Sequence, residues 1–186
     1  CSDSSFSTFG ELIMNNFLIR PNSPMYYPRV KLDFNISVIW NRDVQGVGTI
    51  AQDMAQNFLE GERVLALDLE TTGISTNNDR IVQIALIGSS KDGSEISYEN
   101  LVNPRRSIPI QASNVHGIYD NDVRNLGDFS KFAEEVFEQI EGAVIIGHNV
   151  RQFDLPLLNN EFRRLGRLPP TPKAVLDTLE VVRRIK

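Results

Sequence analysis

The sequence has 186 residues, of which 41% are apolar, and its formal net charge is −5. This length and apolar content suit one globular domain with an additional segment, and the acidic balance argues against a protein that coats nucleic acid through a broad basic surface. The single cysteine, Cys1, excludes an internal disulfide framework, and no apolar run is long enough to span a membrane. We therefore expect an intracellular protein of a reducing, cytoplasmic compartment, with no membrane partner.

Residues 1–60 are predicted to form an N-terminal extension of unknown role. Apolar and polar residues alternate from Val30 to Ser37 and apolar ones continue at every second position to Trp40, which predicts a strand near residues 30–40 with one buried face. Apolar residues at Ile50, Met54 and Phe58 predict a helix near residues 49–60. The extension either packs onto the domain that follows or ends a preceding domain of a longer polypeptide.

The second domain, residues 61–186, opens with an apolar strand that ends in two carboxylates. Val64 to Leu67 are apolar on both faces, as in a strand at the centre of a sheet. Because side chains alternate along a strand, Asp68 and Glu70 project from the same face. Two neighbouring carboxylates at the end of a buried strand suit a hard divalent cation such as Mg²⁺ or Mn²⁺. The alternative is that both are solvated where the strand emerges.

The remaining elements follow in a regular order. Strands are predicted at residues 80–88 and 96–104, joined by a turn at Asp92-Gly93, and together with the first strand they form an antiparallel meander. Apolar spacing then predicts helices over residues 129–140 and 155–165 and from Asp177 onward. Apolar runs at residues 143–147 and 174–176 predict the intervening strands. This succession is an α/β order in which a three-strand meander is followed by αβαβα.

Two stretches of this domain resemble the DEDD exonuclease superfamily. VLALDLETTG, Val64 to Gly73, resembles the first motif of the superfamily, and GHNVRQFD, Gly147 to Asp154, resembles the second. The resemblance implies a ribonuclease H-like mixed sheet and a 3′–5′ exonuclease that hydrolyses phosphodiester bonds with two Mg²⁺ or Mn²⁺ ions. The expected substrate is DNA, in proofreading or repair. By the same resemblance the catalytic and metal-binding residues are Asp68, Glu70 and Asp154, and the substrate-binding residues are Thr71, Thr72, Asn149 and Phe153.

Several residues near these motifs have structural alternatives. Asp154 could be a helix N-cap, since Pro156 fits the first turn of a helix. Asp177, with Glu180 three residues later, is interpreted as a helix cap. His148 is interpreted as a support for the turn, and the stretch from Val115 to Ile118 as a structural loop close to the substrate groove.

The third motif of the histidine branch is not found in this sequence. That motif is a His followed five residues later by an Asp, but Asn121 follows His116 and Phe153 follows His148 at that distance. We therefore expect an exonuclease domain that is C-terminally incomplete. Its partners would be single-stranded or 3′-ended nucleic acid, and a polymerase or other domains of a longer polypeptide. The alternatives are a non-catalytic nucleic-acid-binding or interaction module, and a structural protein that binds no metal.

Overall fold

The structure, a computed structural model, describes residue 52 and residues 59–185. The strand predicted near residues 30–40 lies outside the described residues, as does almost all of the helix predicted near residues 49–60. Leu59 and Glu60, the last two positions of that helix, are not helical. The division of the chain at residue 60 therefore stays a prediction.

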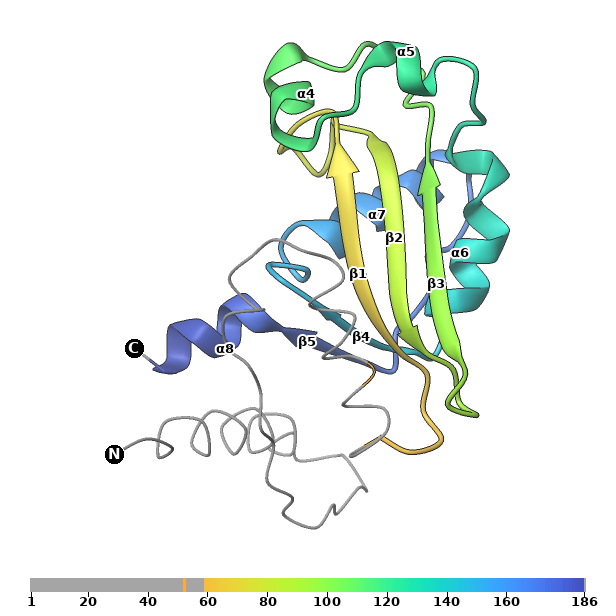
Figure 1. The fold of residues 1–186 in the computed structure, drawn as a ribbon, viewed down its shortest axis with the longest axis vertical. Helices are drawn as coiled ribbons and strands as arrows, with labels where there is room; N and C mark the ends of the chain where they lie inside the picture. The colour runs from red at the N-terminus through yellow and green to blue at the C-terminus, as the bar shows by residue number, and fades with distance from the viewer. Residues whose placement is uncertain (1–51, 53–58, 186) are drawn as a thin grey trace.

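One mixed sheet organises the described residues (Figure 1). Its strands are β1 (Val64–Thr71), β2 (Ile81–Ser89), β3 (Glu95–Leu101), β4 (Val144–Gly147) and β5 (Ala174–Asp177). They are ordered β3-β2-β1-β4-β5, with antiparallel β1–β2 and β2–β3 pairs and parallel β1–β4 and β4–β5 pairs. The predicted meander and the α/β class are confirmed. The apolar strand β1 lies at the centre, where both of its faces are covered.

Two helices cover one face of this sheet and form the main core with it (Figure 1). They are α6 (Ala133–Ile140) and α7 (Asp154–Arg164). The helix predicted from residue 129 is divided in two, since a 3₁₀ turn, η1 (Phe129–Lys131), precedes α6. Asp128 caps this turn, because its Oδ1 accepts a hydrogen bond from the Ser130 N–H at 3.2 Å. Phe129 and Phe162 meet edge to face in this core, with ring centroids 5.2 Å apart.

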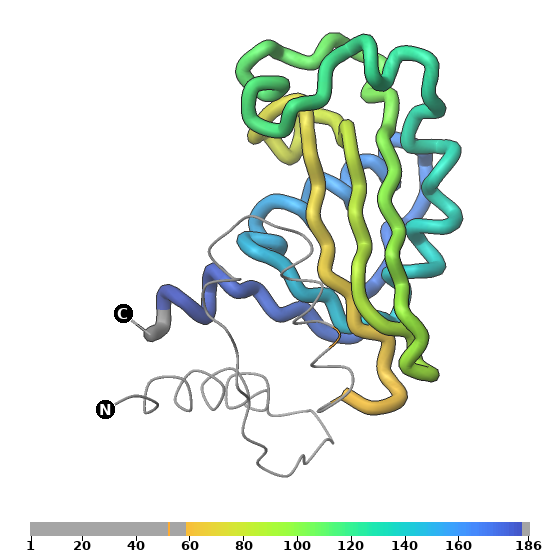
Figure 2. The backbone as a smooth tube through the Cα atoms, in the orientation of Figure 1, coloured from red at the N-terminus to blue at the C-terminus, as the bar shows by residue number. Residues whose placement is uncertain are grey.

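The chain between β3 and α6 crosses over the end of the sheet (Figure 2). It contains two short helices, α4 (Ile110–His116) and α5 (Asp120–Val123), which sequence periodicity does not predict. The prediction that Val115 to Ile118 form a loop is thus wrong for Val115 and His116, which end α4 before the left-handed Gly117. A small second core holds these helices to the sheet, formed by Val82, Ile108, Ile118 and Val123. The short helices depend on this packing and on caps.

The last described element is α8 (Thr178–Ile185), which follows β5 directly. Its predicted capping residue is confirmed, since the N–H of Leu179 donates to Asp177 Oδ1 at 3.0 Å. Within the described part of the chain, every helix is too short or too polar to cross a lipid bilayer.

Candidate active site

The first two candidate residues lie at the carboxyl end of β1. Leu67 and Leu69 are 2% and 5% exposed and point into the core under α6 and α7. Asp68 and Glu70 alternate with them and are half-buried, so their carboxylates lie on the opposite face of the strand. The alternation expected from the sequence is therefore what presents both carboxylates beside each other.

Asp154 comes to the same place from the start of α7. Its side chain is buried, and its Oδ1 accepts a hydrogen bond from the backbone N–H of Leu69 at 3.1 Å. The parallel pairing of β1 with β4 ends at Ala66 and Ile146. Beyond it, the Asp154 carboxylate supplies the acceptor for the Leu69 N–H that a neighbouring strand would otherwise supply. The N-cap interpretation of Asp154 is wrong, because the N-cap of α7 is Phe153 and Asp154 is the first helical residue.

The environment of Asp154 disfavours its negative charge. Burial raises the pKa of Asp154 to about 8, and the nearby negative charges of Asp68 and, more weakly, Asp177 act in the same direction. The hydrogen bonds from its own N–H and from Leu69 oppose this shift only in part. The protein thus holds Asp154 close enough to Asp68 for the two carboxylates to repel each other, and the burial of Asp154 weakens the screening of this repulsion by water.

These carboxylates suit an open divalent site better than a closed one. Among the described residues, no group of three or more His, Cys, Asp or Glu side chains forms a preformed metal cluster. Mg²⁺ is usually held by only one or two carboxylates, with water and substrate phosphates completing its shell. The proximity of Asp68 to the buried Asp154 fits that requirement, because a cation would compensate the repulsion. Glu70, two positions after Asp68 in β1, stays a predicted ligand.

Thr71 ends β1, and Thr72 begins the loop to β2. Thr71 Oγ1 donates to the Gly73 carbonyl at 2.6 Å, and Thr72 Oγ1 donates to Asp79 Oδ1 at 2.8 Å. Both threonines are buried. Their hydroxyls are therefore engaged within the loop, and any contact with a nucleotide would rely on the backbone they shape. Their substrate-binding role stays a prediction.

The β4–α7 loop holds the other two predicted substrate residues. Asn149 has a left-handed backbone with φ 62°, a conformation that Asn tolerates better than most residues. Phe153 is half-buried and packs against the main core. His148 Nδ1 lies 3.1 Å from Thr178 Oγ1, so the interpretation of His148 as a support of this turn is confirmed.

A buried ion cluster that the sequence does not reveal anchors the β1–β2 loop to α7. Glu161 is 1% exposed and accepts two hydrogen bonds from Arg80, at 2.6 and 3.0 Å, and one from Arg164 at 2.9 Å. Arg164 also donates to the carbonyl of Asn77 at 2.6 Å. The loop that follows the carboxylates is thereby fixed to the helix that carries Asp154.

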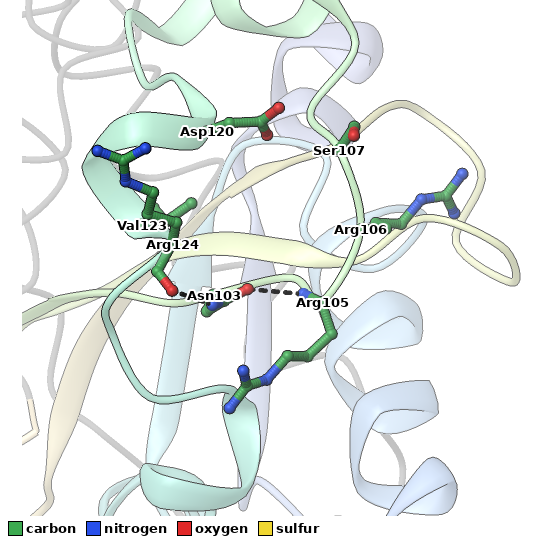
Figure 3. A pocket seen from close by; sticks show the side chains of 7 residues that line it. All are labelled: Asn103, Arg105, Arg106, Ser107, Asp120, Val123 and Arg124. Carbon is green, nitrogen blue, oxygen red and sulfur yellow. Dashed lines mark hydrogen bonds between the residues drawn. The ribbon is translucent and has the colours of Figure 1, made fainter.

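A separate pocket of about 240 Å³ lies between the segment after β3 and α5 (Figure 3). Three arginines line it, but their guanidinium groups point away from one another in Figure 3. Arg105 pairs with Asp128, and the carboxylate of Asp120 lies in the pocket and accepts a hydrogen bond from the Ile108 N–H at 2.8 Å. The cations do not converge and an acidic group is present, so we assign no anion to this pocket.

Comparison with known proteins agrees with this geometry. A family model described as an exonuclease, RNase_T, matches residues 65–186. The 3′-5′ exonuclease DinG of Bacillus subtilis is 35% identical over 123 residues, which are 66% of this chain and 13% of that protein. The DNA polymerase III subunit epsilon of Treponema pallidum is 30% identical over 120 residues, 64% of this chain and 55% of that protein.

Solved structures give the same fold. Exonuclease I of E. coli, in complex with a dA16 oligonucleotide, superposes with a TM-score of 0.56 at 24% identity, over 64% of this chain and 29% of that one. The ribonuclease H-like fold is thereby confirmed. The chain spans between about a tenth and about half of the lengths of the relatives named above.

Proposed function

Since the chain belongs to this exonuclease family, we propose that residues 61–186 remove nucleotides from 3′ ends by metal-assisted hydrolysis of phosphodiester bonds. The observation that carries the proposal is the buried Asp154 carboxylate held against Asp68 at the end of β1. Two carboxylates held this close, one of them buried, favour a bound cation that offsets their repulsion. The relatives named as a 3′-5′ exonuclease and as a polymerase subunit support this direction and a role on DNA.

Asp68, Glu70 and Asp154 would hold two Mg²⁺ or Mn²⁺ ions. When bound, such ions supply a nucleophilic hydroxide at neutral pH and stabilise negative charge on the phosphate and the leaving 3′ oxygen. The chain's own contribution is to hold the carboxylates. Leu69 orients Asp154 through its N–H, and the burial of Asp154 keeps bulk water away from this carboxylate.

The β1–β2 loop would form one wall for the terminal nucleotide. It is fixed at Thr72 by Asp79 and Arg80 and at its far side by the Glu161 cluster, so it presents a rigid backbone beside the carboxylates. Ile74, at the tip of this loop, is 92% exposed and offers an apolar surface to a base. We propose single-stranded or 3′-ended nucleic acid as the substrate, and other domains of a longer polypeptide, such as a polymerase, as partners.

The chain should be slow by itself. Neither His116 nor His148 has an Asp five residues later, so the general base expected from the histidine branch has no counterpart in this sequence. A missing general base lowers a rate by roughly 10²–10⁴-fold. We therefore expect Mn²⁺ binding with weak cleavage.

The test is the direction of cleavage. The 186-residue chain is incubated with Mn²⁺ and a 5′-labelled single-stranded oligonucleotide, with Asp68→Ala as the control. A slow ladder that shortens from the 3′ end, and is lost in the control, supports the proposal. Internal cuts, or single nucleotides released from the 5′ end, would contradict it. Strand binding without any cleavage would favour a non-catalytic binding module instead.

A further inference from the structure

Asp177, the last residue of β5, has more hydrogen bonds than a helix cap requires. Its side chain is buried, and besides the cap to Leu179 it accepts two hydrogen bonds from another part of the chain. The backbone N–H of Asn149 donates to Oδ1 at 2.9 Å, and that of Arg151 donates to Oδ2 at 3.1 Å. Both donors belong to the β4–α7 loop, about thirty positions earlier in the sequence.

The parallel pairing of β4 with β5 makes this contact possible. Gly147 and Asp177 are opposite each other in the register, so both strands end at the same level and the two chains leave the sheet side by side. Next along the chain, Thr178 Oγ1 donates to the Gly147 carbonyl at 3.3 Å and lies 3.1 Å from His148 Nδ1. The β5–α8 junction thus holds the loop from its first residue onward.

The loop held in this way determines where Asp154 lies. Asn149 adopts a left-handed conformation that an L-residue does not favour by itself, and the bond from its N–H to Asp177 stabilises this conformation. The carbonyl of Asn149 then accepts hydrogen bonds from the N–H groups of Gln152 and Phe153, at 3.1 and 3.0 Å. This turn delivers the chain to Asp154, whose carboxylate meets Leu69 of β1.

We infer that Asp177 is a positioning residue for the candidate site: by clamping Asn149 and Arg151, it sets the turn that places Asp154 beside Asp68. This inference rests on the proposed function only for its consequence in metal binding, because the placement of Asp154 is a property of the fold. It assigns to Asp177 a role that its capping of α8 does not explain, since a cap alone needs only the bond to Leu179.

Two substitutions of Asp177 should disturb the placement of Asp154 to different degrees. Asp177→Ala removes all three acceptor contacts. Asp177→Asn keeps one carbonyl oxygen, which can serve Asn149 and Leu179, but its amide group cannot accept from Arg151. The matched control is Asp128→Asn, which alters a different capping aspartate, at η1, whose carboxylate bonds Ser130 and Arg105 and not this loop. A purely capping role predicts that the Asp177 and Asp128 variants behave alike.

The first measurement is amide hydrogen exchange of Leu69, whose N–H is bonded to Asp154. Protection of this amide should fall by about tenfold or more in Asp177→Ala, less in Asp177→Asn, and not at all in Asp128→Asn. The second is calorimetric titration with Mn²⁺, where the affinity should fall by about 10–100-fold in Asp177→Ala. Unchanged Leu69 protection in Asp177→Ala would overturn the inference. If the unsubstituted chain binds no Mn²⁺, the proposed function fails, while the exchange measurement still decides the role of Asp177.

Discussion

The raised pKa of Asp154 makes a prediction about stability that does not depend on activity. At pH values between the ordinary pKa of 3.8 and the folded-state pKa of about 8, Asp154 binds a proton in the folded chain but not in the unfolded one. In the absence of metal, stability must therefore fall as the pH rises through this window. Asp154→Asn removes this dependence, and its amide oxygen can still accept the hydrogen bond from Leu69.

The size of the effect follows from the window. Each pH unit between the two pKa values costs the folded parent about 1.4 kcal/mol, so Asp154→Asn should gain at most about 2.7 kcal/mol over the parent between pH 5 and pH 7. The assay is urea unfolding in EDTA at both pH values. Added Mn²⁺ should stabilise the parent more than the variant, because the variant lacks the Asp154 carboxylate and keeps only Asp68 and Glu70 as ligands.

A second aspartate supplies a control of opposite sign. Hydrogen bonds from Ser130 and the guanidinium of Arg105 lower the pKa of Asp128, so its charge stabilises the fold above the ordinary pKa and this contribution is lost at acidic pH. Asp128→Asn should thus lose stability at pH 7. If Asp154→Asn is destabilised equally at pH 5 and pH 7, the pKa of Asp154 is not raised by burial in the folded chain.

Three further outcomes are expected. Glu161→Gln leaves Arg80 and Arg164 without their buried carboxylate, so unfolding in urea should show a loss of about 3–5 kcal/mol; a loss below about 1 kcal/mol would mean that water replaces the pairing. Gly88→Ala should cost more than about 2 kcal/mol, measured by thermal unfolding, because its Cβ would lie 2.0 Å from the Val64 carbonyl oxygen, whereas Ser90→Ala on the adjoining turn serves as the control. Mn²⁺ affinity should rise with pH up to about 8 and binding should release a proton near neutrality, seen as a buffer-dependent heat; an affinity that is flat from pH 6 to pH 8 would contradict a role for Asp154.

The sequence is sufficient to predict the sheet and the two motif segments because their signals are local. The apolar run from Val64 to Leu67 reads as a central strand whatever its neighbours are, and alternation alone places Asp68 and Glu70 together. The strands of the meander are likewise predicted from short stretches of sequence. Within residues 61–186, the predicted strand positions agree with the structure to within a few residues.

What the sequence does not predict depends on contacts between distant segments. The short helices α4 and α5 have no clear apolar period and form against Val82 and Ile108 of other elements. The Glu161 cluster joins residues about eighty positions apart, and nothing near Glu161 marks it as buried. Similarly, Asp177 resembles an ordinary cap until the parallel pairing of β4 and β5 brings the Asn149 turn to it.

The proposed function depends on a divalent metal site formed by the end of β1 and the start of α7. We would titrate Mn²⁺ calorimetrically into the 186-residue chain and into an Asp68→Ala, Glu70→Ala double variant that is as well folded as the parent. We expect a binding heat in the parent that disappears in the double variant. No binding in the parent, or equal binding in both, would contradict it.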